Sequence, residues 1–154
     1  IDDTYNSSPA AAVAALRALY DLFDQAPQRI ALLGDMRELG ESSQIEHEAL
    51  AAACDPGMLA WVVTVGPLME QYLAPVARQR GCQVKSFTNA IDAAGFIRSV
   101  TEPGAAILAK GSQNEIFLEE AVKNLCVMTE DTKLVRQSPE WLRTKDAFYA
   151  KLGK

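Results

Sequence analysis

The sequence predicts an α/β fold with a doubly wound, mostly parallel sheet, and three observations predict it. Apolar runs of about five residues alternate with helical patterns of about twelve, and the pair repeats along the chain. Each short run is apolar throughout, as expected for parallel strands that helices cover on both faces. With 49% hydrophobic and 23% charged residues over 154 positions, the chain can fill the core of one compact domain.

The expected elements follow from start and stop signals along the chain. Ser8 directly before Pro9 suits the start of the first helix. Ser43 and Glu46 have the spacing of a capping box, and Asn89 suits the cap of a later helix. The expected strands cover residues 1–3, 29–33, 61–65, 83–87 and 105–110. The expected helices cover residues 9–23, 43–53, 68–80, 90–100 and 114–125.

The alternation of strand and helix patterns ends before residues 127–154. We therefore predict a domain of residues 1–126 and an extension of residues 127–154 packed on it. Residues 134–136 are predicted to add a short strand, antiparallel at the sheet edge. Pro139 is predicted to open an amphipathic helical tail that carries Trp141.

Charge and cysteine content argue against several classes of function. Acidic residues outnumber basic ones by 20 to 15, and no Lys/Arg stripe is present, so nucleic acid is not an expected partner. No apolar run reaches the roughly 18 residues of a membrane span, and no basic-then-apolar leader opens the chain. We expect a cytoplasmic protein. The three cysteines, Cys54, Cys82 and Cys126, form no CxxC pair and indicate neither a disulfide framework nor a metal site.

A polar turn follows the first expected strand and contains Asp2, Asp3, Tyr5 and Asn6. Its carboxylates can accept hydrogen bonds from ribose hydroxyls, and a tyrosine and an amide can flank a base. The alternative is a capping and turn cluster, because Asp, Asn and Ser are the residues that turns prefer. The sequence leaves both interpretations open.

A second turn follows the last expected strand and reads Lys110, Gly111, Ser112 and Gln113. A strand, a lysine, a flexible turn and a helix together suit an anion, because unpaired amides and the positive end of the helix dipole point into the turn. The alternative is a tight turn that a solvated lysine ends. A lysine directly after a buried strand favours the anion site.

A third candidate loop, Gly34 to Gly40, begins where the second strand ends. Asp35 and Arg37 lie in this loop, and His47 follows in the next helix. These residues can support a ligand site, or the charged ones can simply be solvated. A lone histidine cannot build a conventional metal site and is more often a structural hydrogen-bond donor.

The chain carries no P-loop, no G-x-G-x-x-G and no G-x-S-x-G motif. It therefore has no recognisable machinery of its own for nucleotide hydrolysis or nucleophilic catalysis. The chain also opens with Ile rather than Met, on what looks like the end of a strand. We expect it to be the C-terminal part of a longer polypeptide.

Three segments in order, DDTYNSSP, then LLGDMRELG with His47 downstream, then LAKGSQNEIFLEEAV, resemble the C-terminal domain of the Mur ligase family. The pattern is most similar to the members that add a D-Ala-D-Ala dipeptide, and it covers about residues 1–125. The resemblance implies a Rossmann-like third domain, joined to a UDP-sugar-binding domain and a central ATPase domain. It also implies a role in peptidoglycan precursor synthesis, hence in cell-wall biogenesis, cell shape and division.

In that family, ATP phosphorylates the carboxylate of a UDP-N-acetylmuramoyl tripeptide, and the amine of D-Ala-D-Ala attacks the acyl phosphate. The resemblance implies that Asp2 accepts from the ribose hydroxyls, with Asp3, Tyr5 and Asn6 near the nucleotide. It implies that Lys110, Gly111, Ser112 and Gln113 face the dipeptide or the acyl phosphate. The P-loop and Mg²⁺ ligands belong to the central domain, so we expect no catalytic residue here and no activity from this fragment alone.

Three alternatives remain open at this point. The first is a Mur ligase domain that serves another amino acid. The second is a noncatalytic receiver-like module, although a receiver needs an aspartate at the end of the third strand, where this chain has Thr64, Val65 and Gly66. The third is an assembly module that uses the helix of Trp141 as its contact.

Overall fold

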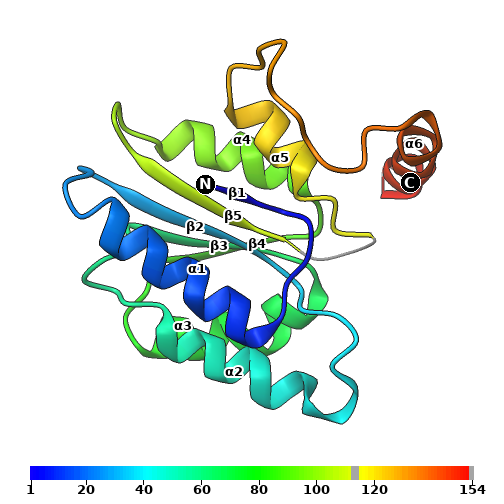
Figure 1. Ribbon diagram of the computed structural model, residues 1–154. Coiled ribbons are helices and arrows are strands. Elements are labelled where there is room, and N and C mark those ends of the chain that lie inside the picture. The colour runs from blue at the N-terminus through cyan, green and yellow to red at the C-terminus, as the bar shows by residue number, and fades with distance from the viewer. Residues whose placement is uncertain (112–114, 153–154) are drawn as a thin grey trace.

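A computed structural model describes residues 1–111 and 115–152 of the chain (Figure 1). Its sheet has the order β1-β5-β2-β3-β4, and every neighbouring pair is parallel. The strands are β1 Asp2–Asp3, β2 Arg29–Gly34, β3 Trp61–Val65, β4 Val84–Phe87 and β5 Ala106–Lys110. Each lies within a residue or two of the predicted range, which confirms the parallel α/β fold.

Helices cover both faces of the sheet (Figure 1). The helices α1 Pro9–Leu22, α2 Ser43–Ala53 and α3 Ala74–Gln79 lie on one face. The helices α4 Ala90–Val100 and α5 Glu119–Leu125 lie on the other. Alternate residues of β2 point to opposite faces, so that Leu33 joins the core with Leu16, whereas Leu32 joins the core with Ile97. Two buried apolar layers therefore hold the strand ends in fixed positions.

The helix starts follow the predicted caps at two places and differ at a third. The Ser8 hydroxyl accepts from the Ala11 N–H at 3.4 Å, and the Asn89 amide oxygen accepts from the Asp92 N–H at 2.9 Å. The capping box at Ser43 is wrong, because a 3₁₀ turn over Gly40–Ser42 runs directly into α2. A cap needs extended backbone, whereas Ser43 has helical angles and a buried hydroxyl with no hydrogen-bond partner.

The helix predicted over residues 68–80 is divided into two parts. A π-helical segment, Met69–Leu73, leads into α3, and the Ala74 N–H donates to the Met69 carbonyl. Pro75 explains the wider turn, since proline has no N–H to donate and its ring clashes with the carbonyl four residues before it.

The helix predicted over residues 114–125 begins later, at Glu119. Before it, Glu115 and Phe117 have φ angles of 60° and 47°, which no helix allows. Ile116 and Leu118 are buried, and a Cβ at Gly34 would lie 2.8 Å from a methyl group of Ile116. The apolar residues thus enter the core beside Gly34 instead of forming the first turn of the helix.

The extension contains the predicted tail helix, α6 Pro139–Leu152, but residues 134–136 are not a strand. Leu134 packs on the core of the α4–α5 face, while β1 already occupies the free edge of β5. The helix α6 lies beyond the carboxyl ends of the strands (Figure 1), where Phe148 meets Phe117 with ring centroids 5.3 Å apart. The division of the chain at residue 126 stays a prediction.

Candidate functional site

The pairing of β1 with β5 brings two of the predicted turns together. Asp3 is the register partner of Lys110, and the Gly111 N–H donates to the Asp3 carbonyl at 3.1 Å. We call residues 2–6 the β1 turn and residues 110–111 the β5 turn. As expected for parallel strands, both turns lie at the carboxyl edge of the sheet. The sequence therefore predicted their proximity correctly.

Gly111 is the point of closest approach between the two turns. A Cβ added there would lie 2.8 Å from the Thr4 carbonyl oxygen and 3.0 Å from the Thr4 Cα. Both atoms belong to the backbone, so a side chain at this position would push the β1 turn away. Glycine is required here by space rather than by its φ angle.

Lys110 is buried, with 3% of its side chain exposed. Its ammonium group lies 3.0 Å from the Asp3 carboxylate and donates to the Asn6 carbonyl. The interpretation of a solvated lysine is therefore wrong, because the ammonium group is buried and these partners offset the cost of removing it from water. Lys110 fastens the end of the β1 turn to the end of β5.

The predicted start of the helix after the β5 turn is wrong, because α5 begins at Glu119 rather than at residue 114. Its N-cap residue, Leu118, still lies close to Gly111, since a Cβ at Gly111 would be 3.2 Å from the Leu118 Cβ. The buried Glu119 carboxylate lies at that helix start and pairs with Arg136 at 2.7 Å and Lys145 at 2.9 Å. Ser112 and Gln113 lie outside the described residues, so their predicted contact with substrate stays a prediction.

Within the β1 turn, short-range hydrogen bonds account for part of the polar side chains. Asp2 Oδ1 accepts from the Thr4 N–H at 3.1 Å and from the Thr4 hydroxyl at 2.7 Å, and the Asn6 amide oxygen accepts from the Ser7 N–H. These are turn contacts, as the second interpretation expected. Tyr5 differs, because 63% of the residue is exposed to solvent. An exposed ring and an exposed carboxylate in the same turn suit the base and the ribose of a nucleotide.

Asp35 belongs to a different part of the sheet edge, after β2. It is 2% exposed and accepts from the Met69 N–H at 2.8 Å and the Leu68 N–H at 3.3 Å. Burial raises the pKa of the Asp35 carboxyl, although these two hydrogen bonds work to lower it. Gly66 makes room for the carboxylate, because a Cβ there would lie 2.4 Å from its carbon atom. Asp35 thus caps the helical segment that follows β3.

His47 is fully buried and uses both of its ring nitrogens within the domain. Nδ1 lies 2.7 Å from the Ser43 carbonyl, and Nε2 accepts from the Met36 N–H at 3.1 Å. These partners require a neutral ring that carries its proton on Nδ1. His47 is therefore a structural residue that ties the loop after β2 to α2.

A cavity of about 300 Å³ lies beside this loop, between the ends of β2 to β4 and α6. Asp35, Glu70 and Phe148 are among its lining residues, and Arg37 and Glu115 form an ion pair of 3.1 Å at its wall. Lys110 does not line it. The residues predicted from the sequence thus form two separate groups, one at the β1 and β5 turns and one at this cavity.

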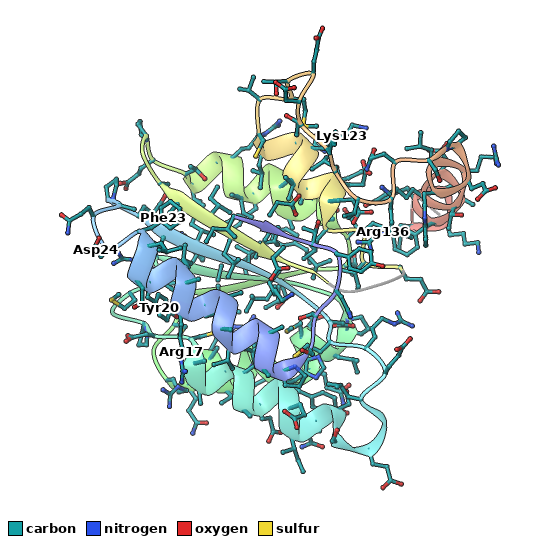
Figure 2. All side chains as sticks on the ribbon, viewed as in Figure 1. Arg17, Tyr20, Phe23, Asp24, Lys123 and Arg136 are labelled. Atoms are coloured by element: carbon teal, nitrogen blue, oxygen red, sulfur yellow. The ribbon has the colours of Figure 1, made fainter. Side chains whose placement is uncertain are left out.

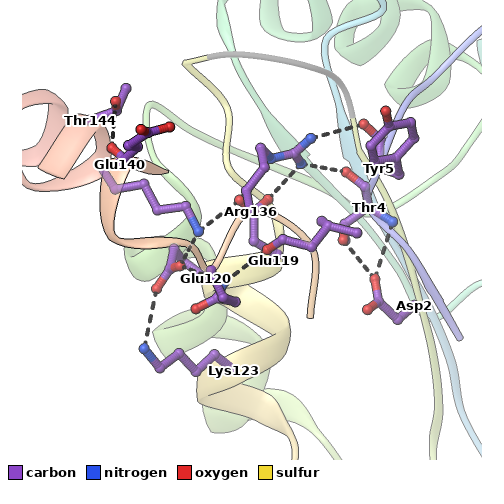
Figure 3. Close-up of polar contacts among 12 residues, drawn as sticks. Asp2, Thr4, Tyr5, Glu119, Glu120, Lys123, Arg136, Glu140 and Thr144 are labelled. Atoms are coloured by element: carbon purple, nitrogen blue, oxygen red, sulfur yellow. Dashed lines mark hydrogen bonds and ion pairs between the residues drawn. The ribbon is translucent and has the colours of Figure 1, made fainter. Parts of the chain in front are cut away.

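One residue at the β1 turn has no counterpart in the sequence-based predictions. Arg136 reaches from the connection before α6 to the chain after β1 (Figure 2), where its guanidinium donates to the Thr4 and Tyr5 carbonyls (Figure 3). The acceptors are backbone groups of residues far away in the sequence, so no motif or spacing could have indicated the contact.

Across residues 1–111 and 115–152, no three His, Cys, Asp or Glu side chains gather in a way that could hold a metal ion. In the same part of the chain, no helix has the length and apolar character needed to cross a membrane.

A parallel α/β domain with its polar turns at the carboxyl edge of the sheet is typical of domains that bind nucleotides and phosphorylated substrates. The sequence model described as Mur ligase, glutamate ligase domain, matches residues 1–113. The chain belongs to the Mur ligase family.

Individual relatives show which members of the family this chain is similar to. The chain is 31% identical over 129 residues to the UDP-N-acetylmuramoyl-tripeptide–D-alanyl-D-alanine ligase of Bacillus subtilis (strain 168), a match that covers 81% of this chain. It is similar to the MurF ligase from Thermotoga maritima in complex with ADP, at 25% identity, a TM-score of 0.64 and 81% of this chain. It is also similar to MurF from Acinetobacter baumannii, at 29% identity, a TM-score of 0.65 and 81% of this chain. In each case the match spans 27% of the relative's own length.

Proposed function

We propose that this chain is the C-terminal domain of an ATP-dependent ligase that joins D-Ala-D-Ala to a UDP-N-acetylmuramoyl tripeptide in peptidoglycan precursor synthesis. The observation that carries the proposal is the pairing of β1 with β5, which holds the β1 turn against Lys110 and Gly111. Both turns lie within the residues that match the family. The relatives with this substrate pair in their names support the choice of substrates.

The β1 turn fits the nucleoside part of ATP. Asp2 is exposed and offers a carboxylate to the ribose hydroxyls, and Tyr5 offers an exposed ring to the base. Asn6 is exposed beside them, while Asp3 is charge-balanced by Lys110. The chemistry that ATP supplies when bound is the activation of the tripeptide carboxylate for attack by an amine. The similarity to a ligase that was solved in complex with ADP supports a nucleotide as a ligand of the complete enzyme.

The β5 turn belongs to the same proposal. Lys110 and Gly111 hold the β1 turn in position. Ser112 and Gln113, which follow them in the sequence, are proposed to contact the dipeptide or the activated carboxylate. The central domain of the ligase supplies the P-loop and the Mg²⁺ ligands. Closure of this domain over the central one excludes water from the activated carboxylate. The proposal places the ligase in the cytoplasm, as expected of an enzyme that consumes ATP.

The test uses the complete ligase that contains these residues. We expect phosphate release to require ATP, the UDP-N-acetylmuramoyl tripeptide and D-Ala-D-Ala together, and mass spectrometry to find the amide-linked product. Phosphate release with a different amino acid in place of the dipeptide would indicate that the ligase is another member of the family. Covalent labelling of the chain by a small phosphodonor, without amide formation, would instead support a receiver-like module.

A further inference from the structure

Three consecutive carbonyl groups of the β1 turn accept hydrogen bonds from cationic side chains. Arg136 Nη2 donates to the Thr4 carbonyl at 2.8 Å, and Nη1 donates to the Tyr5 carbonyl at 3.0 Å. Lys110 donates to the next carbonyl, that of Asn6. The backbone of the turn is therefore held from two sides, by β5 and by the extension.

The Arg136 guanidinium is itself fixed by a buried carboxylate. Its Nε and Nη2 donate to the two oxygens of Glu119 at 2.9 and 2.7 Å (Figure 3). Such a two-point contact sets the plane of the guanidinium as well as its position. Burial works to raise the pKa of Glu119, but the hydrogen bonds from Arg136 and Lys145 lower it, so the carboxylate stays charged.

The extension holds Arg136 in place on its other side. Lys145 of α6 lies 2.9 Å from Glu119 and 2.6 Å from Glu120. The rings of Trp141 and Phe148 meet Phe117 edge to face. The backbone at Arg136 has a φ of 51°, a conformation that this type of residue keeps only where its surroundings fix it.

The ring of Tyr5 is the part of the turn that these contacts orient. The Arg136 guanidinium carbon lies 6.0 Å from the ring centroid. The same side chain donates to the Thr4 and Tyr5 carbonyls, which belong to the two peptide planes on either side of Tyr5. Tyr5 is otherwise open to solvent, with 63% of the residue exposed. Without Arg136, the two peptide planes on either side of Tyr5 would lose these hydrogen bonds, and the orientation of the ring would be less restricted.

We infer that Arg136 is a positioning residue for the nucleotide site and that the extension is part of that site through it. The inference rests on the proposed function, because it assigns nucleotide to the β1 turn. Arg136 does not touch the reacting atoms; it sets the geometry of Thr4 and Tyr5 before the ligand binds. Preorganisation of this kind strengthens ground-state binding of the nucleotide and leaves the chemical step unchanged.

The experiment compares R136A, R136K and R143A in the complete ligase. Arg143 is an exposed arginine of α6 and serves as the matched control. We expect R136A to raise KM for ATP by about tenfold or more with kcat and KM for D-Ala-D-Ala changed by less than about twofold. R136K keeps a charge for Glu119 but lacks the planar fork, so we expect an intermediate KM for ATP. R143A should match the wild type.

Each outcome decides between defined alternatives. An unchanged KM for ATP in R136A or R136K, with the wild type active, would overturn the inference and leave the proposed function intact. Wild-type ligase that neither consumes ATP nor forms the amide would overturn the proposed function first. If R136A does not fold, R136K decides the question, since equal KM values for R136K and R143A would contradict a positioning role.

Discussion

The parallel register of β1 and β5 changes the interpretation of Lys110. In the sequence it is a charge at the end of an apolar strand, which indicates either a ligand site or a solvated side chain. In the structure its ammonium group is enclosed between Asp3 and the Asn6 carbonyl. Its charge therefore fastens the β1 turn and balances the charge of Asp3. We expect any effect of Lys110 on the substrate to act through these two contacts.

Gly111 gives the first test at the scale of a residue. In G111A the new Cβ would lie 2.8 Å from the Thr4 carbonyl oxygen, so the two turns must separate. We expect the free energy of unfolding to fall by about 1–3 kcal/mol, as for other overpacked sites. We also expect ligase turnover at low ATP to fall by about tenfold or more. Urea unfolding and initial rates measure the two effects.

Gly95 is the matched control for this test. It lies within α4, and a Cβ there would meet nothing within 4 Å. G95A should therefore stabilise the chain by about 0.5–1 kcal/mol, because alanine is the better helix former, and leave turnover unchanged. Equal behaviour of G111A and G95A would contradict the tight contact between the turns.

Some positions at the site could be predicted from the neighbouring sequence, whereas others depend on contacts between residues far apart in the chain. The proximity of Asp2, Lys110 and Gly111 could be predicted because each lies in or directly after a strand, and the carboxyl ends of parallel strands share one edge. Arg136 could not, because it binds backbone carbonyls that carry no sequence signature. A lone histidine predicts a structural hydrogen bond, but the partner of His47, the Met36 N–H, depends on a loop path that no pattern indicates.

At the scale of elements, periodicity predicted the strands well and the helix starts less well. Residues 115–118 are the clearest case, since apolar side chains there fit both a helix and a buried loop. The deciding contact is with Gly34, whose missing side chain leaves space for Ile116 and Leu118. That space is provided by β2, so the sequence of residues 115–118 alone could not decide between a helix and a loop.

The start of α5 makes the stability of the chain depend on pH. The pKa of Glu119 is lowered in the folded state, so as the pH falls the unfolded chain takes up the proton first. The stabilisation from this carboxylate is therefore complete above the ordinary pKa of glutamate. It is lost as the pH falls through the lower folded-state value. We expect urea unfolding to show this loss in the wild type and a smaller loss in E119Q.

Glu130, an exposed glutamate of the extension, is the control for this measurement. E130Q should keep the pH dependence of the wild type. At neutral pH, E119Q should also be less stable than E130Q, by about 3–5 kcal/mol if Arg136 and Lys145 are left without their charge partner. Identical pH profiles for E119Q and E130Q would show that the buried cluster contributes nothing to acid sensitivity.

At the scale of the whole molecule, the polar features lie along one edge of the sheet, and the extension closes part of it. The β1 and β5 turns form one group, and the cavity near Asp35 forms another. The extension contacts both, through Arg136 at the first group and through α6 at the second. The first group presents Asp2 and Tyr5 outward and keeps Lys110 and Gly111 inside. Under the proposed function, we expect this arrangement to be half of a site, which a second domain completes by bringing the phosphate end of the nucleotide.

The central claim is that the β1 turn is where this domain meets the nucleotide, and hydrogen exchange of the complete ligase tests it most directly. With saturating ADP, we predict slower exchange in the peptide that covers residues 2–8 and unchanged exchange in α4, which lies on the opposite face from α1. Protection confined to other parts of the ligase, with residues 2–8 exchanging as fast as without ADP, would contradict the claim.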